Sequence, residues 1–326
     1  MARPVAQRLV FTVVTLGLFL GGSEVALRVA GVPKKDPTKD FTHNEIYWVQ
    51  PPNQHLEPLT HKETGDTFRV STDANGLRAP LHPQEKSGTT FRIMTLGCST
   101  TFGWGVNDEE TYPYLLEQNL KADGHNIEVI NGGQPGYTSF QGLWLWQKEL
   151  AAYKPDLVIF GYIVQDSRSV AYSDSSQAVL QGNQDFLKRN ILYNFHLYVL
   201  LENWINAYRM QAKDKPTEGG VFRVSPEEYV DNIRQFKANT DAIGAKLMLF
   251  GYPLEREGYT GTHRRILHAA SDKLGLPLYD PQPDFETYSA QETLYFPQDR
   301  GHANAAGNAK IADGVMQFLV AQRLVP

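Results

Sequence analysis

From residue 91 to the C-terminus, short apolar runs alternate with longer stretches in which apolar residues recur every three or four positions. The short runs indicate buried β-strands, and the longer periodic stretches indicate amphipathic helices. This order of elements predicts βαβ units, and therefore an α/β fold with a parallel sheet covered by helices on both faces. The expected strands are 91–97, 126–131, 155–163, 245–253 and 276–280, and the expected helices are 111–124, 139–153, 225–244, 263–275 and 304–324.

An insertion interrupts this alternation at about residues 167–224. It contains the stretch ILYNFHLYVLLENWINAYRM (191–210), which is apolar on nearly every side of a helix. Polar residues within the stretch, among them His196 and Glu202, argue against a second membrane span. Two interpretations stay open: a helix that packs on the domain, or a lid or membrane-facing cover over an active site.

The N-terminal segment has a pattern of its own. Arg3 and Arg8 precede fourteen uncharged, mostly apolar residues (9–22), which is typical of a secretory signal or a signal anchor. Glu24 and Arg28 follow four positions apart, so they can pair on one face of a helix near a membrane interface. Because no clear cleavage site follows, we predict an uncleaved anchor that spans the membrane as a transmembrane helix. A cleaved signal peptide and a buried helix of a soluble domain are the alternatives.

Residues 32–90 are rich in Pro, Thr, His and Asn and have few periodic apolar runs. This composition predicts a linker and an irregular flank, with a turn at Asn75-Gly76. The chain thus divides into a signal anchor or signal peptide (1–31), this flank, and one globular domain (91–326). An anchor would hold the domain outside the cytoplasm, in the periplasm or at the cell surface, whereas cleavage would release a secreted protein.

Composition narrows the classes of function. The net charge is -5 and the isoelectric point is near 6.0, so the chain lacks the basic surplus that a nucleic-acid partner favours. A single cysteine excludes an intrachain disulfide and a cysteine-based zinc cluster. The sequence has no H-E-x-x-H motif, no acidic calcium loop and no G-x-G-x-x-G after a strand, and His263 and His268 do not share a helix face. We therefore expect no metal and no cofactor.

Four polar clusters follow the expected strands or lie in nearby loops. They are GCS (97–99), NGGQPGYTS (131–139), GYIVQDS (161–167) and FPQDRGHANAAGN (296–308). In open parallel sheets, ligands bind beyond the carboxyl ends of the strands, which is where such clusters would meet. A serine in the first cluster would lie on a tight turn before a helix, where backbone N–H groups face a developing negative charge.

These clusters hold the residue types of nucleophilic catalysis. Asp299 and His302 lie three positions apart, which lets the carboxylate hold one ring nitrogen while the other faces a nucleophile. Ser99 is the expected nucleophile, while attack by the neighbouring Cys98 thiol and a non-catalytic turn are the alternatives. Gln165 carries an amide, which can donate a hydrogen bond to an oxyanion.

In this order, the four clusters resemble the four sequence blocks of the SGNH (GDSL-type) hydrolases, over about residues 91–326. TLGCSTTFGWG is similar to the first block, NGGQPGYTS to the second and VIFGYIVQD to the third, and DRGH matches the D-x-x-H of the last. An N-terminal anchor followed by NGLR resembles a bacterial, membrane-anchored branch of the family. The resemblance implies a three-layer αβα sandwich with a mostly parallel, flavodoxin-like five-stranded sheet, plus the N-terminal hydrophobic helix.

The resemblance also implies a role for each site residue. Ser99 would be the nucleophile, His302 the base and Asp299 its orienting partner. The oxyanion would accept hydrogen bonds from the N–H groups of Ser99 and Gly136 and from the Gln165 side chain. The protein would then be a serine esterase that cleaves a sugar O-acetyl or other acyl ester through an acyl-enzyme. The same triad could instead pass the acyl group to an envelope or exported polysaccharide.

Three positions depart from the family pattern. Cys98 stands where Asp is usual, Gln165 where Asn is usual, and Ile163 where Gly is usual. Because Gln has one more methylene than Asn, its amide reaches roughly 1.5 Å farther. Cys98 is expected to be a small buried residue. Together these departures motivate a further hypothesis, in which the domain is a degenerate binding or assembly module.

Overall fold

The computed structural model describes residues 3–32, 52–53, 59–60, 65–170, 173–178, 191–213, 220–256, 258–297, 299 and 301–326. The chain forms two compact units. One comprises Met1–Asp40 and Ala178–Gly219, and the other comprises Phe41–Gln177 and Gly220–Pro326. The larger unit holds the sheet that the apolar pattern predicts, and the smaller one holds two long helices.

The larger unit is built on a five-stranded sheet in the order β4-β3-β5-β8-β9, with every neighbouring pair parallel. Numbered along the chain, these strands have the order 2-1-3-4-5, which is the flavodoxin-like arrangement. The predicted fold class is therefore confirmed. The strands are β3 (Phe91–Leu96), β4 (Ile127–Asn131), β5 (Leu157–Phe160), β8 (Lys246–Phe250) and β9 (Leu278–Tyr279).

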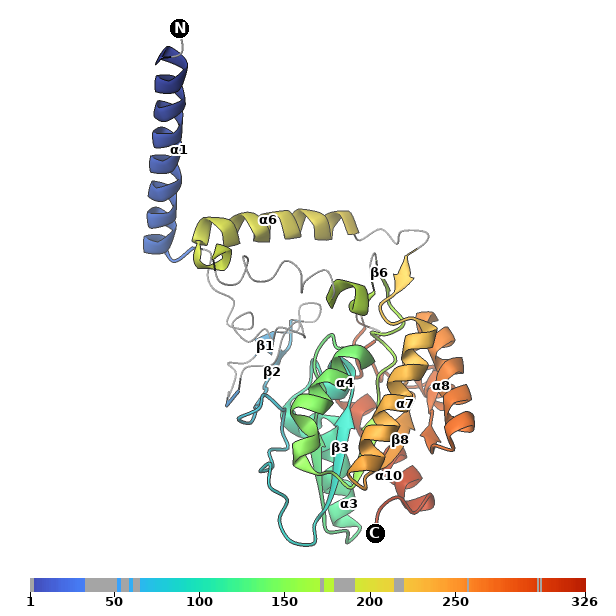
Figure 1. Ribbon diagram of the computed structural model, residues 1–326. Coiled ribbons are helices and arrows are strands. Elements are labelled where there is room, and N and C mark those ends of the chain that lie inside the picture. Colours follow the sequence, from blue (N-terminus) through green and yellow to red (C-terminus); the bar gives the residue numbers. More distant parts are fainter. Residues whose placement is uncertain are drawn as a thin grey trace. The chain divides into compact units, whose positions relative to one another are not determined.

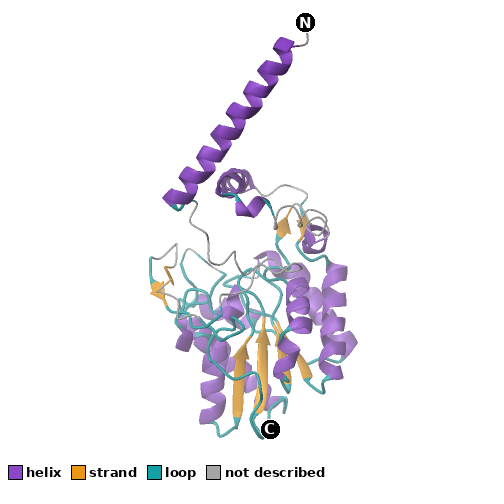
Figure 2. Ribbon diagram, turned by 60° about the vertical axis from the view of Figure 1, so that its left-hand side comes forward, coloured by secondary structure: helices purple, strands orange, loops and turns teal. Residues whose placement is uncertain are grey.

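Helices cover both faces of this sheet (Figures 1 and 2). On one face α3 packs against α10, and on the other α7 lies between α4 and α8. These helices are α3 (Tyr112–Ala122), α4 (Ser139–Lys148), α7 (Pro226–Ala242), α8 (Gly261–Leu274) and α10 (Ala305–Ala321). Shorter helices are α2 (Ser99–Phe102), α9 (Gln282–Ser289), η2 (Asp108–Glu110), η3 (Leu150–Tyr153), η4 (Leu192–Asn194) and η5 (Gly258–Thr260). Two-residue strands are β1 (Leu59–Thr60), β2 (Thr67–Phe68), β6 (Ser169–Val170) and β7 (Val221–Phe222).

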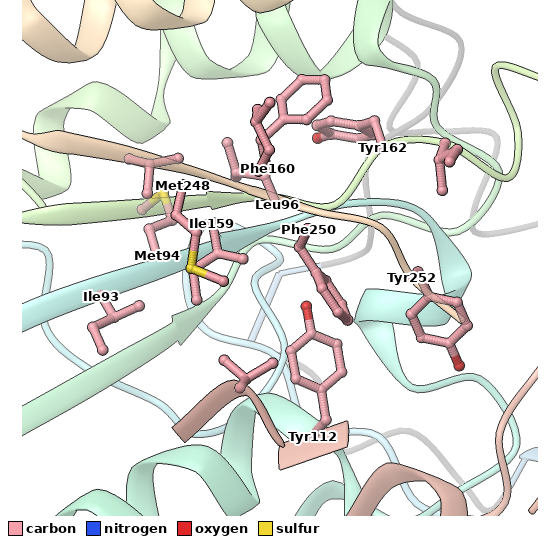
Figure 3. Close-up of a cluster of buried hydrophobic side chains, with 14 of the residues drawn as sticks. Ile93, Met94, Leu96, Tyr112, Ile159, Phe160, Tyr162, Met248, Phe250 and Tyr252 are labelled. Carbon is pink, nitrogen blue, oxygen red and sulfur yellow. The ribbon is translucent and has the colours of Figure 1, made fainter. Parts of the chain in front are cut away.

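Aromatic side chains fill the core on both sides of the sheet (Figure 3). On one side, the rings of Phe160 and Tyr162 meet edge-on with centroids 5.4 Å apart. On the other side, Tyr112 of α3 meets Phe250 of β8 in the same manner at 5.7 Å. Such fully buried side chains each stabilise the fold by roughly 1.5–3 kcal/mol, so they hold the strand ends, and the loops that follow them, in place.

The strands and helices differ from the predicted ones mainly at their ends. The strand expected at 155–163 ends at Phe160, because the chain leaves the sheet there to form the loop of the third block. The helix expected at 139–153 ends at Lys148 and continues as η3. Helix α9 was not predicted, since an eight-residue segment shows too few repeats of the helical period.

Residues 65–90, the longest described part of the expected linker, are irregular but packed. Phe68, Val70 and Leu77 are almost completely buried. The predicted turn at Asn75-Gly76 is present: Gly76 has a φ of 74°, and the Asp73 carboxylate accepts from the N–H of Asn75 at 2.8 Å. This stretch is therefore a flank of the domain rather than a linker, whereas residues 33–51 lie outside the described residues.

In the smaller unit, α1 (Arg3–Ala30) is one continuous helix. Among the described helices it is the one long and apolar enough to span a membrane, over Gln7–Ala30, and none of that stretch is buried. At 24 residues it would reach about 36 Å, enough for a hydrocarbon core of about 30 Å. It is longer than the fourteen-residue run because Glu24 and Arg28 continue the helix and pair at 2.7 Å.

Glu24 also joins α1 to the second long helix of this unit, α6 (His196–Lys213). Its carboxylate oxygens accept from the N–H groups of His196 and Leu197, each at 2.9 Å. The first N–H groups of a helix lack partners within the helix, so Glu24 caps α6. The apolar stretch of the insertion is therefore helical and contacts α1.

Candidate active site

Ser99 lies at the start of α2, directly after the carboxyl end of β3. Gly97 makes this sharp turn possible, because a Cβ there would lie 2.1 Å from Oγ1 of Thr101. The serine is 7% exposed. The N–H groups of Thr101 and Phe102 donate to the Cys98 carbonyl at 3.1 and 2.9 Å, which closes the turn on which the serine lies.

His302 and Asp299 lie in the loop before α10. Asp299 contacts His302, as the D-x-x-H spacing predicts, and His302 contacts Ser99. Nδ1 of His302 lies 2.5 Å from Oδ2 of Asp299, and Nε2 lies 2.7 Å from Oγ of Ser99. An aspartate at Nδ1 keeps the proton on that nitrogen, so Nε2 is free to accept from the serine hydroxyl. The structure thus brings together three residues that span 203 positions of sequence.

The loop that carries His302 is tied to its surroundings. The N–H of Ala303 donates to the Tyr252 hydroxyl at 3.3 Å, and Asn304 caps α10 by accepting from the N–H of Gly307 at 3.0 Å. Asp299 is itself oriented, because its Oδ1 accepts from the N–H of Gly301 at 3.2 Å. The backbone of this loop and the Asp299 carboxylate are therefore both fixed, and together they hold the His302 imidazole in place before any substrate binds.

Cys98 is buried beside Thr100. Its Sγ lies 3.2 Å from Oγ1 of Thr100, and the side chain is 1% exposed. Burial raises the pKa of this thiol above its ordinary value, which keeps it protonated and a poor nucleophile. The prediction of a small buried residue at this position is confirmed.

The glycine-rich loop of the second block lies against the serine turn. The N–H of Gln134 donates to the carbonyl of Gly97 at 3.0 Å. A Cβ at Gly133 would lie 2.4 Å from the backbone nitrogen of Phe102, so only glycine allows this approach. Gly136 has a φ of 80°, the left-handed region that favours glycine. The loop therefore reaches the first block through its backbone.

In the third block, the side chains of the adjacent residues Gln165 and Asp166 have different partners. Asp166 is completely buried, and its Oδ1 accepts from the N–H and the hydroxyl of Ser139 at 3.0 and 2.5 Å. Burial raises the pKa of Asp166 to about 6. Its place is therefore beneath the start of α4, whereas Gln165 is half-buried and contacts Arg223.

Arg223 is a residue that the motifs did not point to. It follows β7 at the end of the insertion and donates from Nη1 to the Gly136 carbonyl at 2.8 Å and to Oε1 of Gln165 at 3.1 Å. Its Nε and Nη2 donate to the two carboxylate oxygens of Asp174 at 2.9 and 2.8 Å. No local spacing could identify it, since these partners lie 49 to 87 positions away.

A second arginine, Arg78, holds the segment that follows the serine turn. Its guanidinium is completely buried and pairs with Asp108 at 2.8 Å. The carbonyl acceptors of its two Nη atoms belong to Phe102, Gly103, Val106 and Arg69. The NGLR element contains this arginine and was the signal that could have identified it.

The two histidines of α8 serve structural contacts. His263 is buried and donates from Nε2 to the carbonyl of Val224 at 2.9 Å, and burial lowers its pKa. His268 is exposed and lies 2.7 Å from Asp280. Within the described residues, no group of three or more His, Cys, Asp or Glu side chains is placed to hold a metal ion.

Comparison with known proteins places this geometry in a family. The model of the GDSL-like lipase/acylhydrolase family matches residues 95–310. An arylesterase of Vibrio mimicus is 33% identical over 73 residues, which are 22% of this chain and 36% of the arylesterase. The chain therefore spans little more than a third of that relative's length.

Solved structures of similar shape include TesA and Axe2, an acetylxylan esterase from Geobacillus stearothermophilus. TesA is 18% identical with a TM-score of 0.48, over 70% of this chain and 97% of its own. Axe2 is 16% identical with a TM-score of 0.48, over 71% of this chain and 95% of its own. Because the family model covers well over half of the sequence, the chain belongs to the GDSL-like lipase/acylhydrolase family.

Proposed function

We propose that this protein is a serine hydrolase that cleaves carboxylic esters with Ser99, His302 and Asp299. The observation that carries the proposal is the continuous chain of contacts from Asp299 through His302 to Oγ of Ser99, at 2.5 and 2.7 Å. Membership of a lipase/acylhydrolase family supports the same reaction class. An intact chain of this kind favours catalysis over a degenerate binding module.

In the first half of the reaction, Oγ of Ser99 attacks the ester carbonyl carbon while Nε2 of His302 takes the hydroxyl proton. Asp299 stabilises the imidazolium that forms. The carbonyl oxygen becomes an oxyanion, which the N–H groups of Ser99 and Gly136 and the Gln165 amide would bind. Collapse of this intermediate breaks the ester bond, and His302 returns the proton to the departing alcohol.

In the second half, a nucleophile attacks the acyl group on Ser99. His302 deprotonates water, the carboxylic acid leaves, and the serine hydroxyl is restored. A sugar hydroxyl in place of water would transfer the acyl group instead, and both outcomes share every residue named above. Hydrolysis is the proposal, and the expected substrates are sugar O-acetyl groups or other acyl esters.

The test uses 4-nitrophenyl acetate, an activated aryl ester chosen because a matched relative is an arylesterase. Ser99→Ala removes the attacking oxygen and is expected to reduce turnover by at least about a thousandfold. Thr100→Ala, at the next position of the same short helix, is the matched control for disturbance of the turn. Equal turnover by wild type and Ser99→Ala would refute the proposal.

We further propose that α1 anchors the protein in a membrane, with the catalytic unit outside the cytoplasm. Support comes from the length and apolar composition of α1 and from the exposed apolar residues of α6, namely Leu201, Trp204 and Ile205. Spaced by three and four positions, these three share one helix face. Because Glu24 caps α6 at the end of α1, that face would meet the membrane surface, where tryptophan is favoured.

An alkaline carbonate wash of membranes tests the anchor in the full chain. We expect the protein to stay in the membrane pellet, with an intact mass that still includes α1. A protein that begins after residue 31 would show that the segment is a cleaved signal peptide, and release of the intact chain by the wash would show that α1 does not span a membrane.

A further inference from the structure

The guanidinium of Arg223 joins two of the expected oxyanion residues. Its Nη1 donates both to the carbonyl oxygen of Gly136 and to Oε1 of Gln165, at 2.8 and 3.1 Å. We propose that Arg223 is a positioning residue, which sets the oxyanion site by fixing the Gln165 amide, while the Gly136 carbonyl helps to hold the guanidinium in place. This proposal rests on the proposed hydrolytic function and concerns the same site.

The chemistry of the contact determines which end of the Gln165 amide faces Arg223. A guanidinium carries only donors, so the amide must present its oxygen to it. The amide nitrogen, with two N–H donors, is then the end left for an oxyanion. If Arg223 were absent, the half-buried Gln165 could turn its amide over, and its oxygen would repel the developing negative charge.

Arg223 is itself held in place. Its Nε and Nη2 bind both oxygens of Asp174, a two-point contact that fixes the plane of the guanidinium. The exposed fractions of the two side chains are 14% and 1%, so little water competes for the pair. Asp174 has a second support, because the Thr138 hydroxyl donates to its Oδ2 at 2.7 Å. The arginine can therefore act as a fixed point for Gln165.

The backbone of the insertion delivers Arg223 to this position. Strands β6 and β7 pair where the insertion leaves and re-enters the catalytic unit, and Arg223 follows β7 directly. Its N–H donates to the carbonyl of Arg168, and its own carbonyl accepts from the N–H of Asp174, both at 2.8 Å. The ends of the insertion thus supply a part of the site.

This support explains how glutamine can stand where the family usually has asparagine. Gln165 has one more rotatable bond than asparagine, so its amide needs an external contact to keep one orientation. Displacement of a reacting group by about 1 Å can cost about a hundredfold in rate. An arginine that holds Oε1 from a rigid position removes that freedom.

The main test is Arg223→Lys, assayed with 4-nitrophenyl acetate. Lysine keeps the charge beside Asp174 but offers a single ammonium, so it cannot hold Asp174, Gln165 and Gly136 together. We expect kcat to fall by about tenfold to a hundredfold, with KM little changed, because the lost contact matters for the transition state. Arg234→Lys is the matched control, since Arg234 pairs with Asp231 on the exposed side of α7.

A double-mutant cycle separates positioning from general support. Gln165→Ala alone removes the donor and is expected to lower kcat by about a hundredfold. If Arg223 acts through Gln165, adding Arg223→Lys to Gln165→Ala lowers kcat little further. If the losses in kcat of the two single variants multiply in the double variant, or if Arg223→Lys has the wild-type kcat, the proposal is overturned.

Gln165→Asn covers the case in which Arg223→Lys unfolds. The shorter side chain draws the amide away from Arg223 and leaves the other contacts of the arginine in place. We expect a loss of about tenfold or more in kcat, although asparagine is the usual family residue, and wild-type or better activity would overturn the proposal. Ser99→Ala distinguishes failure of the positioning role from failure of the proposed hydrolytic function. If Ser99→Ala abolishes turnover while Arg223→Lys and Gln165→Asn match wild type, only the positioning role fails.

Discussion

Two arginines support different segments of the candidate site, and they do so differently. Arg78 is completely buried, and four of its acceptors are backbone carbonyls, three of them in the segment that follows Ser99. Arg223 is partly exposed, and most of its acceptors are side-chain oxygens, including those of Gln165 and Asp174. Arg78 therefore holds the fold of the serine loop, whereas Arg223 holds the orientation of an amide.

This difference determines which substitutions each part of the site tolerates. Backbone acceptors are present whatever the side chains are, so the Arg78 contact tolerates substitutions such as cysteine at position 98. The Arg223 contact depends on side chains, so Gln165 and its arginine must match each other. We therefore expect damage at Arg78 to appear mainly as lost stability, and damage at Arg223 mainly as lost turnover.

The largest expected effect comes from Arg78→Met. It leaves Asp108 without its buried partner and removes the donor to four carbonyls, which should lower the free energy of unfolding by about 3–5 kcal/mol. Urea unfolding measures this loss. Arg69→Met is the matched control: Arg69 pairs with Glu109 but is 64% exposed, so its loss should cost no more than about 1 kcal/mol. Equal losses of unfolding free energy for the two variants would show that the buried contacts of Arg78 do not stabilise the fold more than the exposed ion pair of Arg69.

A smaller, pH-dependent effect is expected on the Arg223 side, at Asp166. Burial raises its pKa from 3.8 to about 6. A folded-state pKa above the unfolded one contributes stability that is present below pH 3.8 and is lost as pH rises through 6. Asparagine has no such titration, so between about pH 4 and pH 7 the unfolding free energy should shift by up to about 3 kcal/mol in favour of Asp166→Asn.

The check is urea unfolding of wild type and Asp166→Asn across that pH range. Only the pH dependence of the difference in unfolding free energy between the two proteins is informative. At any single pH this difference also includes the cost of burying the new amide nitrogen, because Oδ2 of Asp166 has no partner within the described residues. If the unfolding free energies of the two proteins change with pH in parallel, the Asp166 carboxyl does not have a raised pKa.

The smallest effect is expected for Cys98→Ala, on the Arg78 side. The substitution removes one thiol contact with Thr100 and should lower the unfolding free energy by about 1 kcal/mol. Turnover should stay close to wild type, because Arg78 holds the following segment through its backbone. Loss of turnover comparable to that of Ser99→Ala would give the thiol a catalytic role and contradict this account.

The periodic pattern predicted the sheet and its helices, and the resemblance to the SGNH hydrolases predicted that Ser99 meets His302. Parallel strands end at the same edge, so polar clusters that follow apolar runs must come close together. Element ends were less predictable. The strand expected at 155–163 stops at Phe160, although the apolar run continues to Val164 as buried loop, because burial alone does not require a strand.

Contacts between distant residues were beyond the sequence patterns. Arg223 lies 58 positions from Gln165 and 87 from Gly136, in an insertion without a motif. Glu24 looked like half of a local ion pair with Arg28, and its role as the cap of α6 spans 172 positions. Such contacts depend on where loops return to the fold, which periodicity does not encode.

The most direct test of the central claim is covalent labelling of the full-length protein with a fluorophosphonate, read by peptide mass spectrometry. We expect one adduct on Ser99, formed at the same rate in Cys98→Ala and far more slowly in His302→Ala, because in the proposed mechanism His302 takes the serine proton. An adduct on another residue, or equal labelling rates in wild type and His302→Ala, would contradict it.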